Sequence, residues 1–281
     1  TAIYGARGSN GVIVITTKGG KRGKTKFDFS AEYGYNDLAV GSPDALNAQQ
    51  LNELYMDMEG PDAQHWAWDG ETDTDWTDEI LRDQAKQQSY NLSARGGNDK
   101  TEFYLSGGYS GKEGKVDATG FERFSGRAKL QHRPLDNFKI KTNVNSSYSE
   151  QNTVYQGGSF RNPMMARHFL LPMDPVRDEE GNYWWNPSSK RMSNSLFNIP
   201  YIQEHDFADT KTTRIVGSNQ LEWRPIDGLK LSSRLSLDYF GIEEPEYWNP
   251  THGDGQSYQG IAWAYYTRNF NWVWQNMADY T

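Results

Sequence analysis

Apolar and polar residues alternate strictly in many segments of the chain, which is the pattern of β-strands that have one apolar face. The strands predicted in this way cover residues 25–36, 88–96, 101–111, 121–133, 138–150, 211–224, 229–241 and 266–281. A helical spacing of apolar residues occurs in residues 45–58. The pattern therefore predicts an almost entirely β protein with a short helix after its first strand.

The connections between these strands alternate between short and long. Tight turns follow the second, fourth and sixth strands, and the predicted long connections are residues 37–87, 112–120, 151–210 and 242–265. Barrels of the bacterial outer membrane have short periplasmic turns and long external loops, and strands of about ten residues cross the hydrocarbon layer. A soluble β-sandwich hydrolase domain does not require such alternation and fits it poorly.

The first residues of the chain combine three different patterns. Gly5, Gly8 and Gly11 recur at every third position, which suits a tight turn formed by backbone. Residues 12–15 are a β-branched run typical of a strand buried on both faces. Residues 18–26 form a basic, glycine-rich connector. On these residues alone, a glycine-rich turn before any buried strand is the alternative interpretation.

This stretch resembles the junction between plug and barrel in the SusC/RagA family of TonB-dependent outer-membrane transporters. The matching residues are Tyr4-Gly5-Ala6-Arg7-Gly8 and Asn10-Gly11-Val12-Ile13-Val14-Ile15-Thr16-Thr17-Lys18. The resemblance continues through residues 74–80, 90–98, 103–114 and 121–124 and weakens within residues 151–265.

The resemblance implies an all-β fold, namely a transmembrane antiparallel up-and-down β-barrel preceded by the last strand of a plug domain. Residues 1–20 would be the C-terminal end of the plug, and residues 21–281 the N-terminal part of the barrel with its extracellular loops. Such barrels have roughly 22 strands and a plugged lumen. The chain is expected to hold the first eight or so as an open fragment, with Gly19, Gly20 and Gly23 as the plug–barrel hinge.

The resemblance also implies a function, the TonB-dependent import of glycan or peptide oligomers across the bacterial outer membrane, without catalysis. The partners it implies are a SusD-like surface lipoprotein lid, TonB through an N-terminal part that the chain lacks, an oligosaccharide or peptide ligand, and membrane lipid. The alternative is a β-rich outer-membrane adhesin or surface-binding protein that does not transport. The first 20 residues favour the importer, because an adhesin has no use for a buried strand and a basic hinge before its wall.

Composition agrees with this picture. The net charge of −8, from 29 basic and 37 acidic residues, argues against a nucleic-acid binder, which needs a concentrated basic face. The mean hydropathy of −0.87 is low, but only alternate residues of a barrel strand face lipid. Tryptophan (10) and tyrosine (17) are abundant, as in the aromatic girdles of barrels. The absence of cysteine excludes disulfides and cysteine-based zinc sites.

Aromatic residues in the connections are the candidate ligand contacts, because flat rings can stack on sugars or cover peptide side chains. The predicted contacts are Trp66, Trp68, Trp184, Trp185 and Trp248, together with Arg161, which could pair with a polar ligand or be solvated. The alternative is that these residues pack the loops together or lie in the outer interface belt. Trp272 and Trp274 share one face of a strand and are expected to face lipid.

Metal binding and catalysis have weaker signals. Asp69, Glu71, Asp73 and Asp75 alternate in the manner of calcium ligands. However, Thr74 stands where a calcium loop needs glycine, which favours a solvated acidic loop over a structural Ca²⁺ site. The five histidines are scattered, and no G-x-S-x-G motif is present. No cofactor and no catalytic residue are therefore predicted.

Overall fold

The computed structural model describes residues 18–39, 41, 45–154 and 161–281. They form one antiparallel sheet of eight strands in which each strand pairs with its neighbours in sequence. The strands are β1 (Gly23–Asn36), β2 (Ala85–Gly97), β3 (Thr101–Glu113), β4 (Gly120–Leu135), β5 (Phe138–Thr153), β6 (Phe207–Ile226), β7 (Leu229–Trp248) and β8 (Ile261–Tyr280). The predicted up-and-down topology is confirmed.

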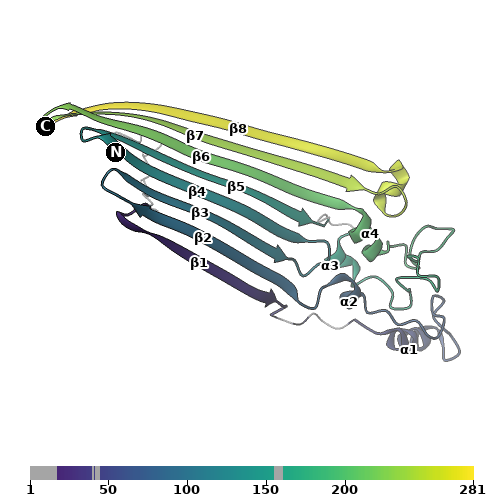
Figure 1. The fold of residues 1–281 in the computed structure, drawn as a ribbon. Coiled ribbons are helices and arrows are strands. Elements are labelled where there is room, and N and C mark those ends of the chain that lie inside the picture. Colours follow the sequence, from purple (N-terminus) through teal and green to yellow (C-terminus); the bar gives the residue numbers. More distant parts are fainter. Residues whose placement is uncertain (1–17, 40, 42–44, 155–160) are drawn as a thin grey trace.

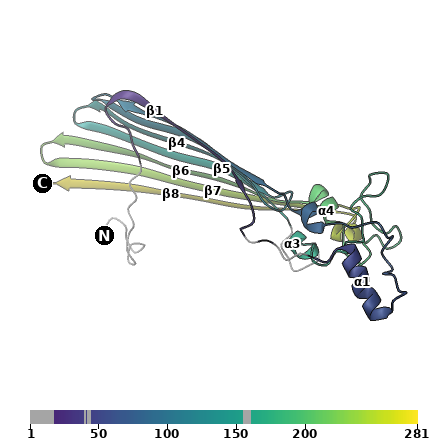
Figure 2. The same ribbon diagram turned by 90° about the horizontal axis from the view of Figure 1, so that it is seen from below.

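The helices and long connections gather at one end of the sheet, and the short turns lie at the other end (Figure 1). The helices are α1 (Ala48–Glu59), α2 (Trp76–Ile80), α3 (Pro163–Ala166), α4 (Ile199–His205) and a 3₁₀ helix, Asp254–Tyr258. Seen from below, these elements lie together as one body beyond the strand ends (Figure 2). We call this body the loop lobe; it comprises residues 45–84, 114–119, 161–206 and 249–260. No helix in the described ranges is both long enough and apolar enough to span a membrane.

The short turns follow from local chemistry. In the β2–β3 turn, the Asn98 side-chain oxygen accepts hydrogen bonds from the backbone N–H groups of Lys100 (3.0 Å) and Thr101 (2.8 Å). Gly228 closes the β6–β7 turn with a φ of +80°, a left-handed conformation that residues with a Cβ avoid. These turns fix the register of the long hairpins.

The two faces of the sheet differ in polarity. Directly opposed residues of neighbouring strands point to the same side, so the register assigns each residue to a face. The apolar face carries Phe29, Leu92, Leu105, Val144, Ile215, Leu237 and Trp272, among others. The polar face carries Asn91, Ser106, Arg127, Asn145, Gln220, Asp238 and Asn271, among others. Large side chains of the apolar face are open, with Phe29 69% and Trp272 61% exposed.

The sheet does not close on itself, since β1 and β8 lie at its opposite edges. This confirms the prediction of an open segment of a larger barrel. A closed eight-stranded barrel, the alternative that the strand number permits, would require β1 and β8 to pair.

Several predicted strand bounds are wrong. β6 begins at Phe207 instead of residue 211, β7 ends at Trp248 instead of 241, and β8 begins at Ile261 instead of 266. The predicted connections 37–87, 112–120, 151–210 and 242–265 therefore shorten to residues 37–84, 114–119, 154–206 and 249–260. The pairing of β7 with β8 continues through the charged residues Glu243, Glu244 and Glu246, where the apolar alternation has already ended.

The first 17 of the 20 residues assigned to the end of the plug lie outside the described residues. This applies to the glycines at positions 5, 8 and 11 and to the predicted buried strand at residues 12–15. The assignment of residues 1–20 to a plug domain therefore stays a prediction.

Candidate ligand-binding site

A hydrophobic core holds the loop lobe together. Its buried members are Trp76, Ile80, Leu81, Ala166, Leu170, Met192, Leu196, Phe197, Ile199 and Ile202. They come from the β1–β2 and β5–β6 connections, which are far apart in sequence. The lobe is thus one packed unit in which each long connection buries apolar surface of the other.

Hydrogen bonds from side chains to backbone join the same connections. The Trp76 indole N–H donates to the carbonyl of Leu171 (2.8 Å). The Gln203 amide, on α4, donates to the carbonyl of Asp117 in the β3–β4 connection (3.1 Å). These two hydrogen bonds therefore link the β1–β2, β3–β4 and β5–β6 connections to one another, which fixes the lobe relative to the ends of the strands.

His252 fastens the β7–β8 connection to this core. Its side chain is fully buried, and its Nε2 accepts a hydrogen bond from the backbone N–H of Asn198 (2.8 Å). Burial, with a smaller effect of the Arg191 charge, lowers the pKa of His252 to about 4. Trp185 stacks on the imidazole with ring centroids 4.3 Å apart, and Trp184 packs against the core. For these two predicted contacts, the geometry favours the alternative of packing between loops.

Arg161 and Trp248, two further predicted contacts, touch each other. The guanidinium of Arg161 lies 4.2 Å from the centroid of the Trp248 ring and forms an ion pair with Asp206. The two charged side chains are only 2% and 8% exposed. Asp206 also accepts hydrogen bonds from the backbone (2.8 Å) and the side-chain amide (2.6 Å) of Asn249. The ion pair therefore joins the β5–β6 connection to the β7–β8 connection and to the end of β7, which is a structural role.

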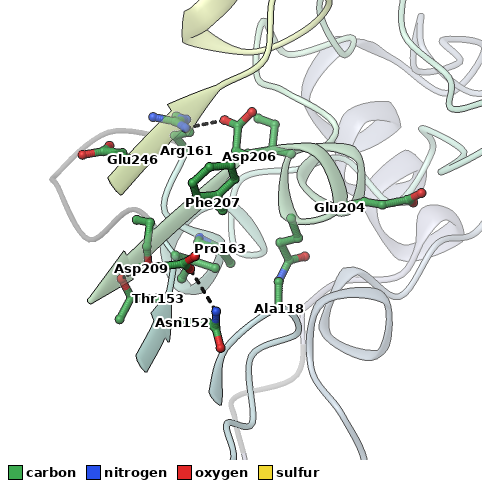
Figure 3. Close-up of a pocket in the computed structure, with 14 residues that line it drawn as sticks. Ala118, Asn152, Thr153, Arg161, Pro163, Glu204, Asp206, Phe207, Asp209 and Glu246 are labelled. Atoms are coloured by element: carbon green, nitrogen blue, oxygen red, sulfur yellow. Dashed lines mark hydrogen bonds and ion pairs between the residues drawn. The ribbon is translucent and has the colours of Figure 1, made fainter. Parts of the chain in front are cut away.

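A cavity of about 210 Å³ opens beside this ion pair, at the junction of the sheet and the lobe (Figure 3). Its walls include Phe207 and Glu246 and the hydrogen-bonded pair of Asn152 and Asp209 (2.9 Å). Pockets for small ligands usually exceed about 300 Å³. This cavity suits one small group and is too small for a whole oligomer.

Trp66 is the predicted contact with the most open ring. It is 65% exposed and stacks on His65, with ring centroids 5.4 Å apart. Burial lowers the pKa of His65, which favours a neutral imidazole next to the indole. Trp68 is half-buried. An open indole on a fixed support is suited to stacking on a ligand.

The acidic residues of the first long connection act as local hydrogen-bond acceptors. Asp69 accepts from Thr72 and from the backbone N–H of Glu71 (2.8 Å), and these bonds, that of the Thr72 hydroxyl first, lower the pKa of Asp69. Asp73 accepts from the first residue of α1 (2.8 Å) and Asp75 caps α2. Within the described residues, no three potential ligands gather into a group that could hold a metal.

Sequence reasoning did not single out the arginines of the polar face. Arg123 and Arg127 of β4 and Arg214 of β6 surround one hollow of the sheet. Each occupies a polar position of a predicted strand, so the alternation of apolar and polar residues already indicates that each arginine lies on the polar face of its strand. Recognising the cluster also required the register between β4, β5 and β6.

Comparison with known proteins finds relatives along the whole chain, although no family model matches it. TonB-dependent receptor P3 of Formosa agariphila is 25% identical over 292 residues, which cover 100% of this chain and 27% of that receptor. TonB-dependent receptor SusC of Bacteroides thetaiotaomicron is 30% identical over 205 residues, which cover 67% of this chain and 19% of SusC. The chain belongs to the SusC/RagA family of TonB-dependent receptors.

Solved structures agree on the fold of this SusC/RagA family member. The RagAB peptide importer in its open-open state matches 100% of the chain with a TM-score of 0.71 and 21% identity, and 35% of that importer chain is covered. Its closed-closed state matches 99% of the chain with a TM-score of 0.67. The chain spans 19 to 28% of the length of its curated relatives, so its sheet corresponds to one part of their barrel.

The predicted hinge of this SusC/RagA family member packs against the sheet at one of its three glycines, Gly20. A Cβ at Gly20 would lie 2.6 Å from the backbone nitrogen of Phe103, so the connector passes directly against β3. Arg22 pairs with Asp99 (3.2 Å) and Glu102 (3.4 Å) at the β2–β3 turn. The other predicted hinge residues are Gly19 and Gly23. A hinge role for these glycines stays a prediction.

Proposed function

We propose that the chain forms part of the wall of a TonB-dependent importer that carries glycan or peptide oligomers across the bacterial outer membrane. The observation that carries this proposal is the similarity to TonB-dependent receptors along the entire chain. Its similarity to SusC and to the RagAB peptide importer supports a transport role over an enzymatic one.

The apolar face has the side chains that a lipid-facing wall requires. Tyr90, Tyr109, Phe124 and Tyr148 lie side by side near the lobe. The hydroxyls of Tyr109 and Tyr148 donate to Glu122 (3.0 Å) and Glu150 (3.2 Å). Such amphipathic rings suit the boundary between lipid and water.

A second set of aromatic residues lies toward the short turns. Phe103, Phe138 and Trp223 occupy this end of the apolar face. On β5, Tyr148 and Phe138 are separated by a distance of about 33 Å along the strand. At a strand tilt of roughly 40°, this gives a band about 25 Å tall, the height of the apolar band of outer-membrane barrels.

The strands continue beyond this band into the lobe. β7 has 20 residues, about 65 Å at the usual rise per residue, against a hydrocarbon layer of about 30 Å. The lobe would therefore stand clear of the membrane on the outside. There a SusD-like lipoprotein could cover it, and TonB would act from the periplasm through another part of the protein.

Uptake of labelled oligomers by intact cells tests the proposal. Cells that express the full transporter take up fluorescent oligosaccharides or peptides, and matched cells lacking TonB serve as the control. Uptake that is lost without TonB is the expected result. Surface binding that persists without any TonB-dependent uptake would contradict the proposal and favour an adhesin.

A further inference from the structure

The centre of the polar face is basic although the chain as a whole is acidic. Along β4, β5 and β6 this face carries Arg123, Arg127, Lys129, Lys139, Lys141 and Arg214. Among the paired residues of these three strands, all of which the structure describes, Glu222 is the one carboxylate on this face. The net charge of the chain is −8, so basic residues are concentrated where a ligand inside the barrel would pass.

Three arginines surround one hollow of about 240 Å³ on this face. Arg123 and Arg127 lie four residues apart on β4, about 13 Å, and Arg214 lies two strands away, about 10 Å. Ser125 and Ser147 are in the row between them, opposite Arg214. The three guanidinium groups can therefore approach a single anion-sized space from different directions.

These arginines differ in how far their charge is balanced. Arg214 pairs with Asp238 (3.1 Å). Arg127 donates to Asn145, which is neutral. Neither Arg123 nor Arg127 forms an ion pair with a carboxylate of the described residues, and no carboxylate lines the hollow. The hollow therefore keeps a positive potential that an anionic group would neutralise.

A second hollow continues the basic surface toward the short turns. It measures about 350 Å³, and its basic lining residues are Lys129, Lys141 and Arg234. Glu102 is the carboxylate among its lining residues. The two hollows share the polar face of β4, β5 and β6. A multivalent anion could contact both in succession.

The lining chemistry favours a hydroxyl-rich ligand. Besides the arginines, the first hollow presents Ser106, Ser125, Ser147 and Asn145, and Val216 is its one large apolar residue. Serine and asparagine exchange hydrogen bonds with hydroxyl groups, whereas the large apolar side chains of a peptide would need an apolar or aromatic lining. Guanidinium forks match the paired oxygens of carboxylates and sulfates.

We propose that the hollow of Arg123, Arg127 and Arg214 binds the carboxylate or sulfate groups of an acidic oligosaccharide. This inference rests on the proposed import function and narrows its substrate class. Acidic peptides, or acidic groups elsewhere in the transporter itself, are the competing partners that an experiment must separate.

Titration of the full-length transporter in detergent separates these partners. The probes are oligogalacturonate, a neutral gluco-oligosaccharide and oligoglutamate of equal length, at low and high salt. The variants are Arg123→Gln and Arg127→Gln, with Arg123→Lys to retain the charge. Arg133→Gln is the matched control, since it removes the same charge from the same strand outside both hollows.

Oligogalacturonate is expected to bind most tightly and to weaken at high salt. Each glutamine variant should weaken it about tenfold, the effect of one charge-assisted hydrogen bond, while Arg133→Gln leaves it within about twofold. Affinity for the neutral probe should not change.

Three results would overturn the inference. One is tighter binding of oligoglutamate than of oligogalacturonate. Another is unchanged oligogalacturonate affinity in both glutamine variants. The third is a lower melting temperature of the glutamine variants together with an equal loss of affinity for all three probes. This result would indicate that the arginines form ion pairs with acidic residues of the transporter itself. Normal binding without TonB-dependent uptake would instead contradict the proposed function alone.

Discussion

At the scale of single residues, His252 shows how the lobe depends on a neutral group. The imidazole has no exposed surface, accepts the N–H of Asn198 and stacks on Trp185. A proton on Nε2 would abolish the first contact and place a charge in an apolar environment. The lobe should therefore be most stable where this histidine is neutral.

Acidification is expected to loosen the lobe between about pH 6.5 and pH 4. The pKa of His252 is lowered to about 4 in the folded state, against about 6.5 unfolded, so the unfolded lobe takes up the proton first. Stability present above pH 6.5 is then lost progressively toward pH 4, by on the order of 3 kcal/mol. Hydrogen exchange of residues 249–260 against pH measures this change.

The matched control for this pH effect is His252→Gln. The lobe of this variant should be less stable at neutral pH, but its stability should no longer fall between pH 6.5 and pH 4. Burial raises the pKa of Asp174 in the same lobe. Asp174 has the opposite effect on stability: its buried carboxylate becomes neutral as the pH falls through the raised pKa, and this protonation stabilises the folded lobe. A slope that persists unchanged in His252→Gln would contradict the assignment to His252.

Removing the charge of Asp206 is expected to destabilise the lobe by about 3–5 kcal/mol, because the buried guanidinium of Arg161 then loses the negative charge of the Asp206 carboxylate. Asp206→Asn is the variant, and limited proteolysis of the lobe is the measurement. Asp37→Asn is the control, since Asp37 pairs with Lys115 at the surface and its loss should change little. Equal protease resistance of Asp206→Asn and the unmodified protein would contradict a structural role for the pair.

At the scale of elements, each strand of the sheet has two environments at adjacent positions. Leu237 lies on the apolar face opposite Trp272, whereas Ser236 lies on the polar face. The account places the first against lipid and the second in the lumen. A charge should therefore be costly at one position and tolerated at the next.

Arginine substitution tests this difference directly. Leu237→Arg should cost about 2–4 kcal/mol if it lies near the bilayer midplane, and Ser236→Arg should cost far less. The measurement is the urea dependence of folding of the full-length protein into lipid vesicles. Equal costs at the two positions would contradict the assignment of the faces.

The sequence predicted the elements that obey a simple period and missed those that do not. Alternation located all eight strands, because residues such as Leu229, Leu231 and Leu235 mark one face. It ended too early at Glu243 and Glu244, since strand pairing there continues without an apolar face. The lobe was less predictable: Trp185 and Trp248 resemble ligand contacts in sequence, and only tertiary packing shows their partners His252 and Arg161.

At the scale of the whole molecule, the open sheet needs further strands at its two edges, whereas the lobe has a hydrophobic core of its own. Among the described residues, no further strand pairs with the outer side of β1 or β8, and the backbone groups of such edges cannot face lipid without further strands. The lobe has its own core and stands beyond the sheet. We therefore regard the described residues as one sector of a barrel wall with a packed lobe at the end of its long connections.

The most direct test of this account is a scan of single spin labels along β7 and β8 in the full-length protein in its membrane. The 281 residues contain no cysteine, so single cysteines for the label can be introduced here once any cysteine in the rest of the full-length protein has been replaced. The account predicts alternation, with lipid-soluble oxygen quenching labels at positions such as 235, 237, 272 and 274 and a water-soluble reagent reaching 234, 236, 271 and 273. Water access at every position, without a period of two, would contradict the claim that this sheet is a barrel wall in a membrane.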